Sequence, residues 1–194
     1  MSATTPNGWP VLEPGSPLLH VWVIPGTNRR ITLLHGPVGL ILVHVLLWFN
    51  DVIERLDGPG NDPIDEGGHN HRLMTGRTDV WSEHAGGDAA DANWNRHPFN
   101  TPAAHSFTAR QIKLIHRRLR WLNTIALGKV VEWGGDWPSH PGSTASPDPM
   151  HWQVNRSKTV THLARVLART PRGKRILAAN PTQHRFIYPV RSAA

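Results

Sequence analysis

The chain has 194 residues, which is enough for one domain with a substantial core. It contains no cysteine, so disulfides and thiolate metal sites are excluded, and a transition-metal site would need histidine and carboxylate ligands. Lys and Arg number 21 against 14 Asp and Glu. This balance favours an anionic partner such as nucleic acid, an anionic membrane or the acidic polymers of a bacterial wall.

The excess of positive charge is concentrated after position 155. This part of the chain has no acidic residue and nine basic ones: Arg156, Lys158, Arg165, Arg169, Arg172, Lys174, Arg175, Arg185 and Arg191. Two interpretations stay open, a solvated cationic tail and a surface that binds an anionic polymer.

No targeting or membrane-spanning segment is evident. The first ten residues, MSATTPNGWP, lack the charged and then apolar order of a signal peptide. The longest apolar run, over 38–49, has 12 residues. A bilayer needs about 20, so we expect a buried helix there and no membrane insertion.

The N-terminal third predicts one or two strands and then a helix. Residues 1–36 are rich in Pro and Gly, and the pieces HVWVI and RRITLL predict strands joined by a turn over 25–28. A helix is expected over 37–56, begun by its Pro37 and ended by 57–59. Apolar residues nearly encircle it, which places it deep in the core.

The middle of the chain predicts a polar loop, short strands and a second helix. The loop covers 58–68, and short strands and turns follow it. The helix is expected over 108–127, where Thr108 can cap it and Gln111 complete a capping box. Its apolar stripe consists of Ile112, Ile115, Leu119, Leu122 and Ile125.

The last third continues the mixture of strands and helices. KVVEWGGDW predicts a strand that runs into a glycine turn, PSHPGSTASPDP a loop and MHWQV a short strand. A third helix is expected over 157–169 and is ended by Pro171. The absence of a βαβ rhythm favours an α+β fold with a small mixed or antiparallel sheet and flanking helices.

Two short stretches carry candidate chemistry. In SEHAGGDAADAN (82–93), the residues between His84 and Asp91 are mostly Gly and Ala, which let the backbone fold back tightly. The pair suits a catalytic acid–base pair, a metal site or a plain surface loop. In PDPMHWQ, Asp148 and His151 stand three positions apart and could supply a base and a third metal ligand. They could equally form a turn whose Asp caps the next strand.

These stretches resemble a known enzyme family. Residues 82–91 match the pattern S-x-H-x-x-G-x-A-x-D of the zinc D-alanyl-D-alanine carboxypeptidase and L-alanyl-D-glutamate endopeptidase family. EWGGDW, followed by D-x-x-H-W-Q over 148–153, is similar to the second motif of its bacteriophage endolysins. NGWPVL, the apolar helix and NWNRHP resemble actinobacterial-phage members, so the likeness covers most of the chain.

The resemblance implies a metal site and roles for its residues. His84, Asp91 and His151 are the expected Zn²⁺ ligands, and Asp148 is the expected general base. Arg72 is expected to bind a substrate carbonyl or carboxylate and to steady the oxyanion, with Arg77 as the competing arginine. The implied architecture is the zinc peptidase fold shared by hedgehog and DD-peptidase domains.

Further side chains are candidates for substrate contact. Ser82 resembles a residue that supports the ligands or touches the substrate, and Trp133 and Trp152, with Trp94 and Trp137, could line the cleft.

Two acidic residues in or beside the motifs, Glu132 and Asp88, are expected to have roles other than metal binding. Glu132 precedes a Trp-Gly-Gly turn, which favours a structural or cleft role over a catalytic one. Asp88 departs from the family, where many members carry Arg or Thr, and it is expected to add negative charge near the metal.

The expected domain spans 1–194. Strands and the buried helix occupy 1–60, the metal-site core 61–155, and a basic helix and tail 156–194. The expected enzyme is a zinc metallopeptidase that hydrolyses stem-peptide bonds in peptidoglycan, with L-alanyl-D-glutamate endopeptidase favoured. The alternatives are a D-alanyl-D-alanine carboxypeptidase and a non-catalytic module that binds the cell wall.

The expected setting is a phage-infected bacterium. A phage enzyme of this kind is made in the host cytoplasm without a signal peptide and reaches the wall through a holin. Its partner is peptidoglycan, with anionic wall polymers as a second partner of the basic C-terminal part. Nucleic acid is not expected as a partner, and the protein is expected to be a monomer.

Overall fold

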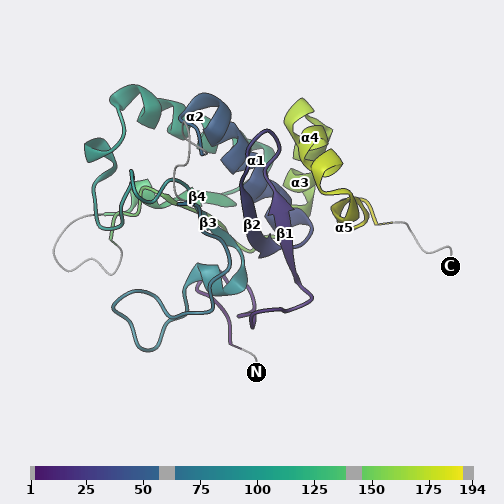
Figure 1. Ribbon diagram of the computed structural model, residues 1–194, viewed down its shortest axis with the longest axis horizontal. Coiled ribbons are helices and arrows are strands. Elements are labelled where there is room, and N and C mark those ends of the chain that lie inside the picture. Colours follow the sequence, from purple (N-terminus) through teal and green to yellow (C-terminus); the bar gives the residue numbers. More distant parts are fainter. Residues whose placement is uncertain (1–2, 57–63, 139–145, 190–194) are drawn as a thin grey trace.

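The computed structural model describes residues 3–56, 64–138 and 146–189. Over these ranges the protein is mixed α+β, with five α-helices and two small antiparallel sheets (Figure 1). The predicted fold class is confirmed at this level.

The first sheet is a hairpin near the N-terminus. Strand β1 (Leu19–Val23) pairs antiparallel with β2 (Arg30–Leu34) in a register that runs from Leu19 opposite Leu34 to Val23 opposite Arg30. One or two strands and a turn were predicted here, and the structure confirms the turn and two strands.

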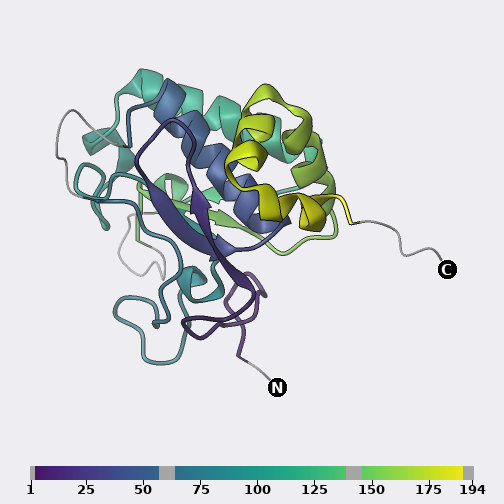
Figure 2. The ribbon, with the colours of Figure 1, turned by 45° about the vertical axis from the view of Figure 1, so that its right-hand side comes forward.

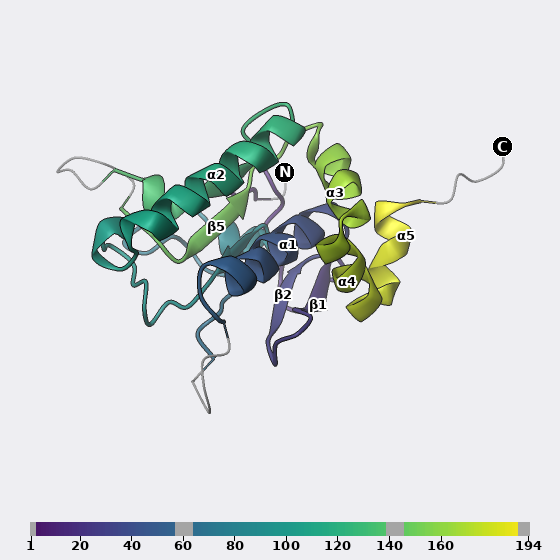
Figure 3. The ribbon, with the colours of Figure 1, turned by 90° about the horizontal axis from the view of Figure 1, so that it is seen from above.

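Helix α1 (Pro37–Val52) lies at the centre of the molecule. Its side chains from Val38 to Phe49 are all buried, as its apolar composition predicts. It contacts α3 (Val160–Arg169), α4 (Pro171–Ala179), β5 (His151–Val154) and the hairpin (Figure 3). It ends four residues earlier than predicted, because the N–H groups of Ile53 and Glu54 both bond to Phe49 O. No helix in the described part of the chain is long and apolar enough to cross a membrane.

Helix α2 (Ala109–Ile125) confirms the second predicted helix and its cap. The Thr108 side chain accepts from Gln111 N, and the Gln111 side chain accepts from Thr108 N. Its buried residues are Ile115, Leu119 and Leu122. The helix packs on β4 (Val131–Trp133) and α3.

The second sheet has the order β3-β5-β4 and is antiparallel throughout. Strands β3 (Ala89–Asp91), β4 (Val131–Trp133) and β5 (His151–Val154) are only three or four residues long. Before β3 the chain forms the short 3₁₀ turn η1 (Glu83–Gly86), and after β4 it forms η3 (Gly134–Asp136). The remaining 3₁₀ turns are η2 (Ala103–His105) and η4 (Pro181–Gln183).

The basic C-terminal part is mostly folded. Helices α3 (Val160–Arg169), α4 (Pro171–Ala179) and α5 (His184–Ile187) follow one another, and α3 and α4 pack on α1 (Figure 2). Pro171 ends α3 as predicted, but it also begins α4, where Thr170 caps the new helix. The interpretation of this part as a solvated tail is therefore wrong for 160–187, since apolar residues such as Ile176 and Ile187 are fully buried.

Candidate metal centre

The register of the second sheet brings two candidate ligands face to face. Asp91 of β3 lies directly opposite His151 of β5. Side chains alternate between the two faces of a strand, so Gln153 shares the face of His151, while Trp152 points the other way. Glu132 of β4 lies opposite Gln153, which extends the same polar face across the sheet. We call it the metal face.

The turn before β3 supplies the third candidate ligand. His84 lies in η1, and Gly87 ends that turn in a left-handed conformation with φ of 69°. Glycine adopts this conformation at little cost, which explains the glycine at this position of the motif. The turn and β3 together bring His84 back beside Asp91.

The three side chains converge within the distance that one ion could bridge. His84 Nε2 lies 3.2 Å from His151 Nδ1 and 3.2 Å from Asp91 Oδ2, and His151 Nδ1 lies 3.1 Å from Asp91 Oδ1. All three residues are buried. The structure therefore assembles a His84–Asp91–His151 group that could hold a metal ion, as the resemblance implied.

The outer nitrogen of each imidazole already has a partner. His84 Nδ1 lies 2.7 Å from Gly68 O, and His151 Nε2 lies 3.0 Å from Gln153 Oε1. Each of these nitrogens can therefore donate its proton outward, which leaves a lone pair on His84 Nε2 and on His151 Nδ1. Two lone pairs that face each other require a proton or a cation between them.

The donor set fits a tetrahedral divalent ion. Bonds of about 2.0–2.2 Å to nitrogen and oxygen place neighbouring ligand atoms roughly 3.3–3.6 Å apart. The observed 3.1 and 3.2 Å are close to that spacing. Two imidazoles and one carboxylate also leave the fourth position open, as in catalytic zinc sites.

A backbone segment over 65–70, which we call the strap, supports two of the ligands, His84 and Asp91. Gly67 and Asp91 exchange two backbone hydrogen bonds, of 2.7 and 3.2 Å, and Asn70 N donates to His84 O at 3.1 Å. The sequence analysis assigned this strap only to a polar loop, because backbone carbonyls such as Gly68 O have no side-chain signature.

The ligands form an ion pair when no metal neutralises them. Burial opposes the charge of Asp91, but the charge of His84 and hydrogen bonds from both imidazoles outweigh it and hold the pKa of Asp91 well below its usual range. Burial also opposes the charge of His151, yet Asp91 raises the pKa of His151 to about 9. A proton therefore competes with a metal for this site, so the affinity for the metal should decrease as the pH decreases.

Asp148 lies beside this group, and one of its carboxylate oxygens has no hydrogen-bond partner. It is 8% exposed, and its Oδ1 has no hydrogen-bond partner. Burial raises the pKa of Asp148 to about 6; Asp91 adds to the rise, while His151, His84 and Arg72 oppose it. A carboxyl with this pKa can accept and release a proton near neutral pH.

The glycine turn after β4 is what seats Asp148. A side chain at Gly134 would place its Cβ 2.4 Å from Asp148 O, so only glycine fits there. Asp148 N donates to Gly134 O at 2.9 Å. The first glycine of EWGGDW, Gly134, is thus required for the close approach of the Asp148 backbone.

The two candidate arginines are separated by their surroundings. Arg72 is exposed, and its charge is one of those that lower the pKa of Asp148. Arg77 lies in an exposed turn, where it pairs with Asp79 at 3.2 Å. Of the two, Arg72 is therefore the arginine whose charge reaches Asp148, although its Nη1 donates to Leu73 O at 3.1 Å.

The side chains expected to contact substrate, Ser82, Trp133 and Trp152, are mostly engaged in contacts within the protein. Ser82 is 6% exposed and caps η1 by accepting from His84 N at 3.3 Å. Trp133 and Trp152 are 2% and 0% exposed, and their rings stack at 5.9 Å on the core side of the sheet. In this conformation Trp152 presents no surface to a substrate.

Two other tryptophans flank the ligands with partly exposed rings. Trp137 lies 5.3 Å from the His151 ring between centroids, and it lines a hollow of about 340 Å³ beside β4. Trp94 is 36% exposed and lies against Gly67 of the strap.

Glu132 reaches the metal face only through other side chains. Its Oε1 accepts from Asn155 and pairs with Lys129, both at 2.8 Å, and Gln153 Nε2 approaches its Oε2 at 3.4 Å. Burial alone would raise the pKa of Glu132, but the bonds from Lys129 and Asn155 outweigh it and lower that pKa. Gln153 is the functional residue that the sequence analysis left without a role.

Asp88 does not carry the simple negative charge that its type suggests. It is fully buried, and its carboxyl lies within hydrogen-bonding reach of the Glu83 carboxyl. Burial, reinforced by the charge of Glu83, raises the pKa of Asp88 far above its usual range. At neutral pH this pair of carboxyls therefore holds a proton.

Comparison with family models, with curated proteins and with solved structures gives no match for this chain.

Proposed function

We propose that the protein is a zinc-dependent peptidase that hydrolyses stem-peptide bonds of bacterial peptidoglycan, as a phage endolysin does. The observation that carries the proposal is the juxtaposition of three convergent metal donors with Asp148, a buried carboxyl that has an unpartnered oxygen. Both motifs that resemble the zinc carboxypeptidase and endopeptidase family contribute to this juxtaposition. The zinc peptidase fold of that family is part of the proposal.

The residues divide the chemistry between them. Bound Zn²⁺ would supply a Lewis acid that polarises the scissile carbonyl and lowers the pKa of water from 15.7 to about 7. Asp148 accepts the proton of the attacking water and returns it to the leaving amine. Arg72, which is exposed beside Asp148, stabilises negative charge on the carbonyl oxygen or on a substrate carboxylate.

The outer partners of the ligands keep the imidazoles in the required tautomers. Gly68 O holds the proton of His84 on Nδ1, and Gln153 holds that of His151 on Nε2. This arrangement leaves the inward nitrogens free to bind the metal before the substrate arrives.

The bond we favour is that between L-Ala and D-Glu, because EWGGDW with D-x-x-H-W-Q resembles the endopeptidases of the family more than its carboxypeptidases. The runner-up is a D-alanyl-D-alanine carboxypeptidase. A module that binds the wall without turnover is the alternative from another class.

Digestion of purified peptidoglycan distinguishes these functions. We expect bound zinc by elemental analysis and new N-terminal D-Glu in the digest, with activity lost on chelation and restored by Zn²⁺. His84→Ala should abolish both metal and activity, while His105→Ala, at an exposed histidine outside the site, should change neither.

The other outcomes have clear meanings. Free D-Ala without new D-Glu termini identifies the carboxypeptidase. A protein that retains peptidoglycan but releases neither product is the binding module, and the enzymatic proposal is then wrong.

A further inference from the structure

A second candidate region, lined by arginines and tryptophans, lies between α1, α2 and the beginning of α4. It consists of two hollows, of about 280 and 340 Å³, that share Arg118 and Trp121 in their linings. We call the two together the arginine groove. Its lining includes Trp48, Arg117, Arg118, Trp121, Arg172 and Arg175.

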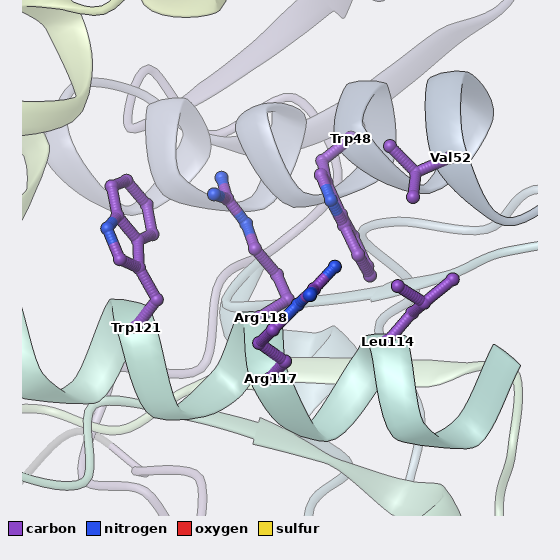
Figure 4. A pocket seen from close by; sticks show the side chains of 6 residues that line it. All are labelled: Trp48, Val52, Leu114, Arg117, Arg118 and Trp121. Carbon is purple, nitrogen blue, oxygen red and sulfur yellow. The ribbon is translucent and has the colours of Figure 1, made fainter. Parts of the chain in front are cut away.

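Arg118 is the centre of the groove. Its side chain rises from α2 toward α1 between the rings of Trp121 and Trp48 (Figure 4). The guanidinium carbon lies 4.3 Å from the Trp121 ring centroid and 5.6 Å from that of Trp48. Its Nη2 lies 2.6 Å from His44 Nδ1, whereas its buried Nε has no hydrogen-bond partner.

The protein neutralises only part of the positive charge of the groove. Among the described residues, no carboxylate forms an ion pair with Arg117, Arg118 or Arg175, and the one acidic lining residue, Asp51, pairs with Arg172 at 2.9 Å. Burial, with the charges of Arg118 and Arg172, lowers the pKa of His44 well below its usual value, so this histidine is neutral. Burial and Arg172 also lower the pKa of Arg118 to about 9.

The arrangement suits an elongated anion better than a single ion. The arginines are spread along two joined hollows on two helices, and a guanidinium pairs well with phosphate oxygens. Trp121 is 40% exposed in the middle of the groove and offers an apolar ring to a sugar or polyol.

We propose that the arginine groove binds a phosphate-bearing polysaccharide of the bacterial wall, with phosphates on its arginines and sugar on Trp121. The choice of a wall polymer over nucleic acid rests on the proposed function. The groove gives the basic part of the chain a partner, but it is built by α1, α2 and α4 together rather than by the C-terminal segment alone.

Calorimetric titration with purified wall teichoic acid, a phosphodiester-linked polymer without stem peptide, tests the groove. We expect Arg118→Gln to weaken binding by about tenfold or more, because a charge-assisted contact is lost. The double variant Arg117→Gln with Arg175→Gln changes exposed side chains only and should weaken binding similarly. Arg110→Gln is the matched control, since it removes the same charge from an exposed position of α2 outside the groove.

Three results would overturn the inference. The first is that teichoic acid does not bind, and the second is that Arg110→Gln weakens its binding as much as Arg118→Gln does. The third is that duplex DNA binds as tightly as teichoic acid and competes for the same arginines. Peptide release is measured separately on peptidoglycan stripped of its phosphate polymers. Failure of the groove thus leaves the peptidase proposal intact, and the reverse also holds.

Discussion

The metal face and the arginine groove both gather charged side chains from different elements, but they differ in how those side chains are arranged. On the metal face, His84, Asp91 and His151 point at one position, and the outer nitrogens of both imidazoles have partners. In the groove, the arginines lie side by side, and among the described residues only Arg172 pairs with a carboxylate, that of Asp51. The first region suits a compact cation, and the second suits an extended anion.

This difference shows that net charge alone identifies neither partner. The chain carries a formal charge of +7, yet its best-formed candidate site is one for a cation. Local convergence of donors, and which of them already have partners, determine the sign and shape of the ligand that each region can take.

Asp148→Asn should have the largest effect among the changes that leave the metal donors in place. Loss of a general base typically costs about 10²–10⁴-fold in turnover. Elemental analysis should still find the metal, because Asp148 is not one of the converging donors. Metal loss in this variant would place Asp148 among the ligands, and unchanged turnover would remove it from the mechanism.

Gln153→Leu tests whether the outer partner of His151 matters. Without an acceptor for Nε2–H, the imidazole can adopt the wrong tautomer, and metal affinity should fall about 10–100-fold. Competition with a chromophoric chelator measures this. Gln153→Glu keeps an acceptor oxygen and should retain affinity, and equal losses in both variants would point to packing instead.

The pH dependence of peptide release should follow Asp148. Its pKa of about 6 is raised, and only the carboxylate accepts a proton, so activity is present above that pKa and lost as the pH falls through it. A bound cation moves this limb to lower pH. We therefore expect kcat/KM to fall about tenfold per pH unit below a midpoint at or under 6. The Asp148→Asn variant should lack this limb in a full pH profile.

The smallest effect is expected for Arg118→Met in the groove. Methionine keeps an unbranched side chain between the two tryptophan rings and removes a charge that burial disfavours, which offsets the lost contact with His44 Nδ1. The free energy of unfolding should therefore change by less than about 1 kcal/mol. Urea denaturation without polymer measures this. A loss of several kcal/mol would mean that Arg118 is a structural residue and not only a binding one.

Local patterns predicted the elements well where a single short-range signal was strong. The capping box of Thr108 and Gln111, the hairpin turn and the buried helix after Pro37 all follow from neighbours within a few residues. The helix after Pro171 was missed, because the proline was interpreted only as a stop, although it also suits a first turn.

For the candidate site, the sequence likewise predicted the residue types in the motifs but not their surroundings. The residue types of His84, Asp91, His151 and Asp148 stand in the two motifs, so the sequence could propose them together. It could not tell that Trp152 is fully buried, while Trp133 and Trp137 both line the hollow beside β4. Nor could it find Gly68 O, a backbone atom without a residue signature.

The sequence by itself determined the donor chemistry of this protein: without cysteine, any transition-metal site must be built from histidine and carboxylate. Only the tertiary structure decided that Asp91 lies opposite His151, that Gln153 and Gly68 orient the imidazoles, and that arginines from α2 and α4 share one groove. These are contacts between residues far apart in the chain. They depend on strand register and helix packing, which the whole core sets together.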